Sequence, residues 1–498
     1  MSESSLLHHD RQKLDRAFVG GMAWTAGAKW VSQLVSWPSV LICARLLSQY
    51  DFGVVEMAGF YFIITNVVAE FGVGMAVLQM RELNAAIVAQ LNSLAMAGGT
   101  LAFAASVLAA PWIAAFFHAP ELHKLVIVAS LTFILTSFEA IPLGLLQRDM
   151  DYRRLSLAES LQAIVTAVVS VACAFAGFAY WAILAGNLLG RASNIALVIW
   201  WRPVRFAVPV WRDVARPLSF GMEIAAQRIV GSFTGLSDSM IIGRTLGAAP
   251  LGTYRLASNL ASTPSEKIGA LIMRVTGPLF ARVQGDNDLL RRYFLIFTET
   301  LALTTFPLLI GLAVVAPDAV RCLLSDKWAS AAVPMSWLAI YMTIRTLSYL
   351  NSQLLTTLRF TRFGMWISIL NFILMPVAFF VMSKGGIGAV AAAWLLLAPV
   401  SIVPITIRVL RETNCTFVAY LGSLMPAALG SLAMVLAVAA LRHWWLPDNW
   451  VALLRLVIEV LVGGAAYAGI LGTFYRERIM QYYRFFLEFR LSSKLAAA

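Results

Sequence analysis

Apolar runs of about 20 residues follow one another along almost the whole chain, and they limit what it can fold into. Hydrophobic residues make up 60% of the 498 residues and charged residues only 13%, with a mean hydropathy of +0.78. A soluble domain is roughly 45–50% apolar and about 25% charged. Because no water-soluble core could bury this much apolar surface, the sequence predicts an all-α polytopic membrane protein.

The apolar runs predict about fourteen transmembrane helices, since one crossing of the hydrocarbon core takes about 20 residues. The predicted spans are 18–44, 52–78, 87–113, 123–146, 155–176, 180–200, 217–242, 251–281, 293–316, 331–357, 363–383, 386–407, 417–441 and 450–474. The first run has no small-residue cleavage site, so we interpret it as a retained span rather than a signal peptide. No run between the spans is long enough to form a soluble domain.

Basic residues are unevenly distributed between alternate loops. With both termini placed in the cytoplasm, most Lys and Arg residues outside the spans fall on the cytoplasmic side. The opposite loops hold Arg45, Lys124, Arg244, Arg321, Lys327, Lys384 and Arg442. The positive-inside rule expects this asymmetry, and one span more or fewer would invert every later loop. The formal charge of +12 thus reflects membrane topology, and no basic–aromatic motif indicates nucleic acid.

Two stretches of the chain align without gaps at an offset of 199 residues. The aligned pairs are Ala26 with Ala225, Lys29 with Arg228, Val31 with Val230, Ile42 with Ile241, Arg45 with Arg244, Leu47 with Leu246, Gly53 with Gly252 and Ala58 with Ala257. An even number of spans separates the copies, so they share one orientation, as in parallel repeats of transporters. We therefore expect an N-terminal lobe (1–200), a C-terminal lobe (201–410), two additional helices (411–475) and a basic tail (476–498), which is expected to lie along the inner leaflet. The last five residues of the tail resemble a tag remnant.

Eight basic residues fall inside the predicted spans, where a charge costs roughly 2.5–3.5 kcal/mol and usually faces a protein interior or watery cavity. They are Lys29, Arg191, Arg228, Arg255, Lys267, Arg274, Arg345 and Arg455. Glu459 follows Arg455 by four residues, so those two can pair along one helix. Arg191 has no obvious partner in the sequence.

Five of the other six cations lie on the first, seventh and eighth spans, and the repeat relates the first span to the seventh and the second to the eighth. Lys29 and Arg228 both lie roughly 16 Å from the cytoplasmic ends of their helices. Acidic residues accompany them, namely Glu56, Glu70, Glu223, Asp238 and Glu266. This pattern predicts a water-accessible cavity with surplus positive charge, which suits an anionic substrate, because guanidinium and ammonium groups bind phosphate. The alternative is that these charges pair with one another and only tie helices together.

Two motifs resemble those of polysaccharide exporters. The first runs from Arg45 to Ala58 and resembles R-L-L-x-x-x-D-F-G-x-x-x-M-A. The second resembles D-x-x-x-I-G-R-x-L-G-x-x-x-L-G-x-Y-x-x-A and comprises Asp238, Ile242, Gly243, Arg244, Leu246, Gly247, Leu251, Gly252, Tyr254 and Ala257. Pro278, Leu279, Phe280, Trp328, Pro334 and Leu338 continue the similarity. The chain is similar to the Wzx-type polysaccharide transporter branch of the multidrug/oligosaccharidyl-lipid/polysaccharide (MOP) flippase superfamily.

The resemblance implies two six-helix lobes in a V, and translocation of undecaprenyl-diphosphate-linked oligosaccharide from the cytoplasmic to the outer leaflet of the bacterial inner membrane. The expected diphosphate-binding residues are Lys29, Arg228, Lys267, Arg274, Arg255 and Arg345. The expected ion-coupling residues, for protons or sodium, are Glu70, Glu223, Asp238 and Glu56. Expected partners are the polymerase and glycosyltransferases of the same pathway, with no cofactor or metal; the four scattered cysteines form no metal motif.

Three alternatives stay open at this stage. A multidrug/cation antiporter of the same superfamily would need an acidic or aromatic cavity. A peptidoglycan-precursor flippase of the same superfamily would be distinguished by failure of cell-wall synthesis on depletion. A membrane-embedded glycan polymerase or ligase would need a large outer loop and a catalytic acid/base pair, and the sequence shows neither.

Overall fold

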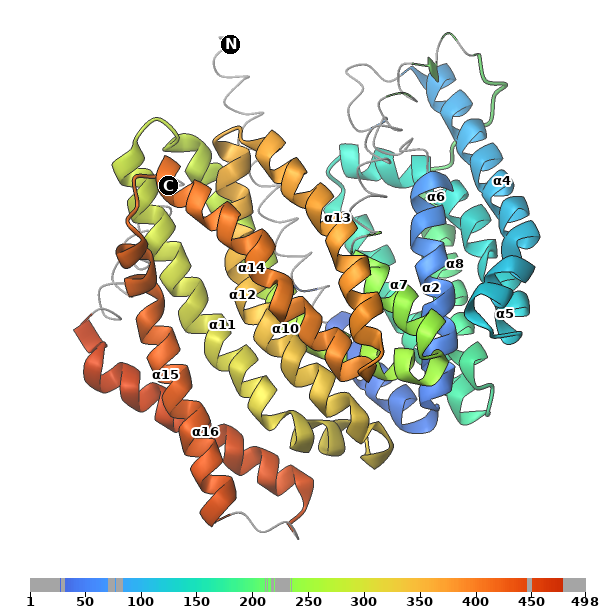
Figure 1. Ribbon diagram of the computed structural model, residues 1–498. Helices are drawn as coiled ribbons and strands as arrows, with labels where there is room; N and C mark the ends of the chain where they lie inside the picture. Colours follow the sequence, from blue (N-terminus) through green and yellow to red (C-terminus); the bar gives the residue numbers. More distant parts are fainter. Residues whose placement is uncertain are drawn as a thin grey trace. The chain divides into compact units, whose positions relative to one another are not determined.

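The structure is a computed structural model that describes residues 32–69, 84–210, 235–445 and 450–477, with isolated positions at 27, 77, 212, 214, 215, 219 and 233. Within these residues the regular structure is helical and contains no strand. The chain divides into two compact units, Met1–Gly252 and Thr253–Ala498. Figure 1 labels the helices of both units.

The first unit is helical. Its described helices are residues 32–46, α2 (Gln49–Ala69), α4 (Ala85–Phe117), α5 (Glu121–Ala129), α6 (Leu131–Arg148), α7 (Tyr152–Phe175), α8 (Tyr180–Trp201) and residues 235–245. Small residues let neighbouring helices approach closely, as is common in membranes. A Cβ atom added at Gly190 of α8 would lie only 2.0 Å from Thr166 Oγ1 of α7, and one added at Gly99 of α4 only 1.7 Å from Ser137 Oγ of α6.

The second unit is also helical. It contains most of α10 (Ala248–Arg282), which begins in the first unit, and then α11 (Asn287–Leu323), the 3₁₀ helix η1 (Asp326–Ala331), α12 (Ala332–Thr357), α13 (Thr361–Ser383), α14 (Gly386–Glu412), α15 (Phe417–Trp444) and α16 (Ala452–Phe474). A core cluster of this unit includes Phe280, Phe294, Leu350 and Tyr420, and the rings of Phe294 and Tyr420 stack at 5.9 Å.

The described helices confirm the predicted class of an all-α polytopic membrane protein. Nine candidate spans among the described residues are long and apolar enough to cross a membrane, with α5 and α6 counted as one. The predicted spans 251–281 and 331–357 match α10 and α12, which are helical throughout but are not among these nine. Both carry many polar residues, so their composition differs from that of a lipid-facing helix. Predicted span 18–44 is described only in part, and 217–242 mostly lies outside the described residues. The predicted lobe boundaries stay predictions.

The sequence repeat recurs as a pattern of helix, break and helix. One helix ends at residue 46 and α2 begins at Gln49, whereas another ends at residue 245 and α10 begins at Ala248. The two helix ends, and likewise the two helix starts, are 199 residues apart, which is the offset of the sequence alignment. The second break contains Gly247 at φ +91°, a conformation that glycine adopts without steric cost.

The first turns of α2 and α10 contact each other through their glycines. A Cβ atom at Gly53 would lie 1.7 Å from the carbonyl oxygen of Ala248, and one at Gly252 would lie 2.2 Å from the carbonyl oxygen of Gln49. Gln49 and Ala248 are equivalent positions of the repeat, so the contact is reciprocal. Only glycine permits this approach of backbone to backbone.

This contact predicts different outcomes for two glycines of the same helix. Gly53→Ala should destabilise the protein by about 1–3 kcal/mol, the usual cost of overpacking, because the obstructing atom belongs to the backbone. Gly59→Ala is the matched control, since its nearest neighbour is Glu56 Oε2 at 3.8 Å, and it should be neutral or slightly stabilising. Thermal unfolding in detergent measures both. Equal midpoints for the two variants would contradict the proposed contact.

Four charged side chains form a buried cluster where α11, α15 and α16 meet; we call Asp318, Arg442, Arg455 and Glu459 the charged cluster. Arg442 Nε lies 2.6 Å from Glu459 Oε1, and its Nη2 lies 3.1 Å from Asp318 Oδ2. Arg455 Nε lies 3.3 Å from Asp318 Oδ1. The sequence interpretation of an Arg455–Glu459 pair on one helix was therefore incomplete, because packing of three helices adds the other two charges.

Arg442 links both carboxylates of the charged cluster, and Glu459 is fully buried. Arg442→Ala leaves these acids buried without their shared cation and should cost about 3–5 kcal/mol. Arg321→Ala is the control, because its pair with Asp326, at 3.9 Å, is exposed and should contribute about 1 kcal/mol or less. Unfolding midpoints of the purified variants test this, and an Arg442→Ala midpoint as high as that of Arg321→Ala would refute the role of the charged cluster.

Candidate functional site

Helix α10 has one face that packs against α12 within the second unit. Ser265 Oγ lies 2.5 Å from Thr346 Oγ1. One turn later, a Cβ atom at Gly269 would lie 2.4 Å from the Tyr349 ring, so glycine allows this ring to lie against the helix. These contacts recur at the four-residue spacing of a helix face and fix the rotation of α10 about its axis.

The opposite face of α10 carries Lys267 and Arg274. Lys267 lies two positions before Gly269, which places it roughly 200° around the helix axis from that glycine. Arg274 follows Lys267 by two turns, roughly 10 Å along the helix. Both side chains are exposed, as is Glu266. Among the residues that the structure describes, no ion pair involves Lys267 or Arg274. The structure therefore brings two of the predicted diphosphate ligands onto one accessible helix face.

The other predicted cations are placed less uniformly. Arg345 of α12 is half-buried, with Nη1 3.6 Å from Met342 Sδ, and lies one turn before Tyr349 on the side of α12 that contacts α10. Arg255 is half-buried near the start of α10. Lys29 and Arg228 lie outside the described residues, so the predicted set of six cations is described only in part.

The predicted ion-coupling acids also divide into described and undescribed residues. Asp238 is buried, and its Oδ1 accepts hydrogen bonds from the backbone N–H of Ser239 at 2.6 Å and from Ser239 Oγ at 3.2 Å. Glu56 is half-buried on α2. Glu70 and Glu223 lie outside the described residues. The described acids thus include one well-bonded carboxylate and leave the coupling role a prediction.

Arg191, for which the sequence offered no partner, forms an ion pair within the first unit. Its Nε lies 3.7 Å from Glu139 Oε2, with α8 supplying the cation and α6 the acid. The two residues are far apart in sequence, so only the packing of these helices could reveal the pair. Arg191 is therefore not an additional candidate for substrate binding.

The first exporter-like motif builds the start of α2. Asp51 Oδ2 accepts hydrogen bonds from the Ser48 backbone N–H at 2.9 Å and from Ser48 Oγ at 2.6 Å, which satisfies a donor at the helix N-terminus. Asp51 Oδ1 accepts from the Tyr180 backbone N–H at 3.1 Å and so ties α2 to the start of α8. Asp51 of this motif therefore serves helix capping and packing.

The second motif makes contacts with the end of α4. Arg244 Nη1 lies 2.5 Å from His118 Nδ1, and its guanidinium lies 5.4 Å from the centre of the Phe116 ring.

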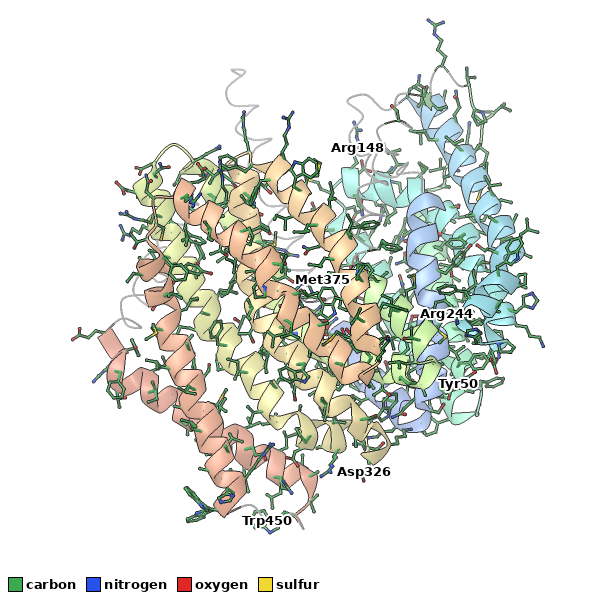
Figure 2. The ribbon with its side chains drawn as sticks, viewed as in Figure 1. Tyr50, Arg148, Arg244, Asp326, Met375 and Trp450 are labelled. Atoms are coloured by element: carbon green, nitrogen blue, oxygen red, sulfur yellow. The ribbon has the colours of Figure 1, made fainter. Side chains whose placement is uncertain are left out.

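Tyr50 of the first motif, labelled with Arg244 in Figure 2, donates a hydrogen bond to Glu121 at 3.0 Å. Burial, and then Glu121, raise the pKa of Tyr50 to about 12, so the phenol remains a donor. Neither contact could be predicted from the sequence.

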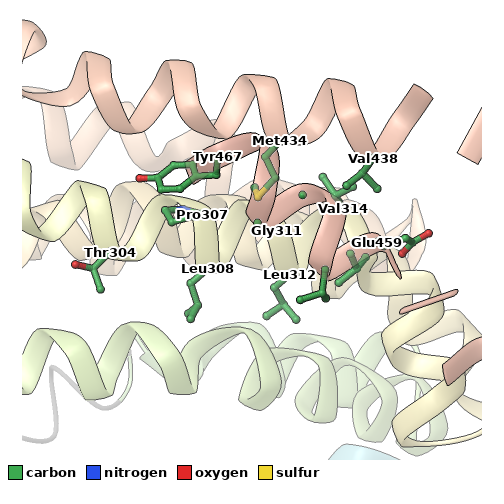
Figure 3. A pocket seen from close by; sticks show the side chains of 14 residues that line it. Thr304, Pro307, Leu308, Gly311, Leu312, Val314, Met434, Val438, Glu459 and Tyr467 are labelled. Carbon is green, nitrogen blue, oxygen red and sulfur yellow. The ribbon is translucent and has the colours of Figure 1, made fainter. Parts of the chain in front are cut away.

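An apolar cavity of about 430 Å³ lies between α11, α15 and α16 (Figure 3). Its lining includes Leu308, Leu312, Met434 and Tyr467, with Glu459 of the charged cluster at one end. The lining offers apolar contact and contains no cation to bind a phosphate. Among the described residues no group of His, Cys, Asp and Glu could hold a metal ion. The exposed face of α10 is therefore the better candidate for anion binding.

Comparison with known proteins places this geometry in context. The family model described as "Polysaccharide biosynthesis protein" matches residues 42–334. The teichuronic acid biosynthesis protein TuaB of Bacillus subtilis (strain 168) is 25% identical over 348 residues, 69% of this chain and 71% of that protein. The lipopolysaccharide biosynthesis protein WzxC of Escherichia coli (strain K12) is 24% identical over 339 residues, 66% of this chain and 67% of that protein.

Solved structures show the same fold at low sequence identity. The lipid II flippase MurJ, in an inward closed conformation, matches with a TM-score of 0.75 at 13% identity, covering 91% of this chain and 99% of that one. An inward-facing multidrug resistance MATE family transporter of the MOP superfamily matches with a TM-score of 0.57 at 14% identity, covering 77% and 96%. These findings confirm the MOP-type fold and the exporter resemblance expected from the motifs.

Proposed function

Because the chain belongs to the polysaccharide biosynthesis protein family, we propose that it is a flippase for an undecaprenyl-diphosphate-linked oligosaccharide. Its fold is that of membrane transporters, and its curated relatives act in polysaccharide biosynthesis. The proposed direction is from the cytoplasmic to the outer leaflet of the bacterial inner membrane, with both termini in the cytoplasm. The polymerase and glycosyltransferases of the same pathway are the proposed functional partners.

The observation that carries the proposal is the exposed pair Lys267 and Arg274 on one face of α10. A diphosphate crossing hydrocarbon loses its hydration, and a positively charged, hydrated surface lowers that barrier. Arginine can bind phosphate oxygens through two N–H groups, and lysine supplies a compact positive charge. Two cations separated by roughly two helical turns can contact a diphosphate together with the sugar that follows it.

The remaining predicted residues complete the proposed site. Lys29, Arg228, Arg255 and Arg345 are proposed to contribute further cations, and Glu56, Glu70, Glu223 and Asp238 to couple the cycle to protons or sodium. Alternating access, as in other transporters built from repeats, is the proposed cycle. A multidrug/cation antiporter is a weaker proposal, because a free cation pair on α10 would repel an organic cation.

Charge-removing variants of α10 test the proposed site. Lys267→Ala and Arg274→Ala should each reduce export about 10-fold or more, since a hydrogen bond to a charged group contributes roughly 1.5–3 kcal/mol. Export is measured as surface polysaccharide, together with accumulation of the lipid-linked precursor, in a strain that depends on this chain. Lys267→Arg retains the charge and should keep most of the activity.

Arg362→Ala is the matched control, because Arg362 is an exposed arginine in the first turn of α13 and is not one of the predicted binding residues. It should export normally. If Lys267→Ala and Arg274→Ala are produced at wild-type levels and also export normally, the cationic site is wrong. Binding of purified protein to a lipid diphosphate, a peptidoglycan precursor or an organic cation then distinguishes the three transporter classes.

A further inference from the structure

Residues 202–210, which we call the connecting segment, follow α8 as an irregular chain bound to α4. The backbone N–H of Ala207 donates to Ser93 Oγ at 3.0 Å, and that of Val210 donates to Gln90 Oε1 at 2.9 Å. Asn92 Nδ2 donates to the carbonyl oxygen of Arg205 at 3.4 Å. Polar side chains of a helix thus serve as hydrogen-bond partners for an irregular backbone.

This pattern of hydrogen bonds is the one required where water is scarce. Irregular backbone persists at membrane depth only when protein groups satisfy its N–H and C=O groups. Gln90 and Asn92 are both buried, and Val204 packs against the neighbouring apolar cluster of Val88 and Leu91. The inner side of the connecting segment is therefore held by the protein.

The position of these contacts along α4 fixes their depth. Helix α4 has 33 residues, which gives roughly 50 Å, whereas the hydrocarbon core is about 30 Å thick. With α4 centred on the core, about 10 Å of helix extends beyond it at each end. Gln90 and Ser93 lie five to eight residues after the start at Ala85, roughly 8–12 Å along the helix. The contacts thus lie near the boundary between headgroups and acyl chains.

The outer side of the connecting segment is both apolar and cationic. Phe206, Val208 and Val210 are 58%, 85% and 51% exposed. Arg205 is exposed between them and Arg202, and in the described part of the chain no ion pair includes Arg205. Arg202 pairs with Asp149. Just before the segment, Trp200 is 75% exposed, and tryptophan is enriched at membrane interfaces.

We propose that the connecting segment is a binding site for anionic phospholipid, in which Arg205 binds the headgroup phosphate and Phe206 and Val208 enter the acyl region. The exposed apolar side chains alone would fit any hydrocarbon, but an exposed arginine at headgroup depth favours a negative lipid by about 1 kcal/mol, roughly five-fold in occupancy. This site is separate from the α10 cations and does not depend on the molecule transported.

The experiment uses the full chain in lipid nanodiscs, with Cys43, Cys173, Cys322 and Cys415 replaced by Ala and an environment-sensitive fluorophore attached at Val208→Cys. Quenching by brominated phosphatidylglycerol is compared with quenching by brominated phosphatidylcholine. The same label at Gly285→Cys, in an exposed turn between α10 and α11, is the control. We expect quenching at position 208 and not at 285, with up to roughly five-fold preference for the anionic lipid.

Arg205→Gln should remove the preference for phosphatidylglycerol and leave the quenching by phosphatidylcholine unchanged, with the thermal midpoint of the parent protein. Three results would each overturn the proposal: no quenching at position 208, equal quenching by both lipids before the Arg205 change, or protection of the label that persists in detergent and rises with protein concentration. The last result would assign the surface to a second copy of the chain.

Discussion

The lack of water in the hydrocarbon core is the constraint on which the other features of this structure depend. Backbone groups must find partners within the chain, and the helices provide them. Charged side chains must pair, or must face a hydrated space. In the charged cluster and in the Arg191–Glu139 pair, the charged side chains are paired. Lys267 and Arg274 are exposed on a helix whose opposite face is packed, and we propose that they face a hydrated space.

Close packing of glycines and small residues decides where those helices lie. Gly53 and Gly252 allow the first turns of α2 and α10 to approach backbone to backbone, and Gly269 allows Tyr349 to lie against α10. Without a strong hydrophobic drive between helices in lipid, such contacts and interhelical hydrogen bonds determine helix association. The orientation of the cations on α10 therefore follows from residues that carry no charge. A change in that packing would rotate the cationic face even if Lys267 and Arg274 were retained.

The residues that identify the family are mostly structural. Asp51 caps α2 and binds the start of α8, whereas Arg244 contacts His118 at the end of α4. Lys267 and Arg274, which carry the proposed anion binding, follow the second motif on the same helix and are not part of it. Family membership thus supports the transport class, and the site itself has to be argued from charge and exposure.

The sequence by itself determined the helical membrane class, the repeat with its 199-residue offset, and the identity of the basic residues within the predicted spans, because hydropathy and charge are local properties. It placed helix boundaries well where loops are short, as at the turn between α13 and α14. Only the tertiary structure decided which cations are paired. Arg191 and Arg455 meet acids on other helices, and Lys267 and Arg274 face away from α12. A partner on another helix depends on rotation and packing of both helices, and neither leaves a periodic signal in the sequence.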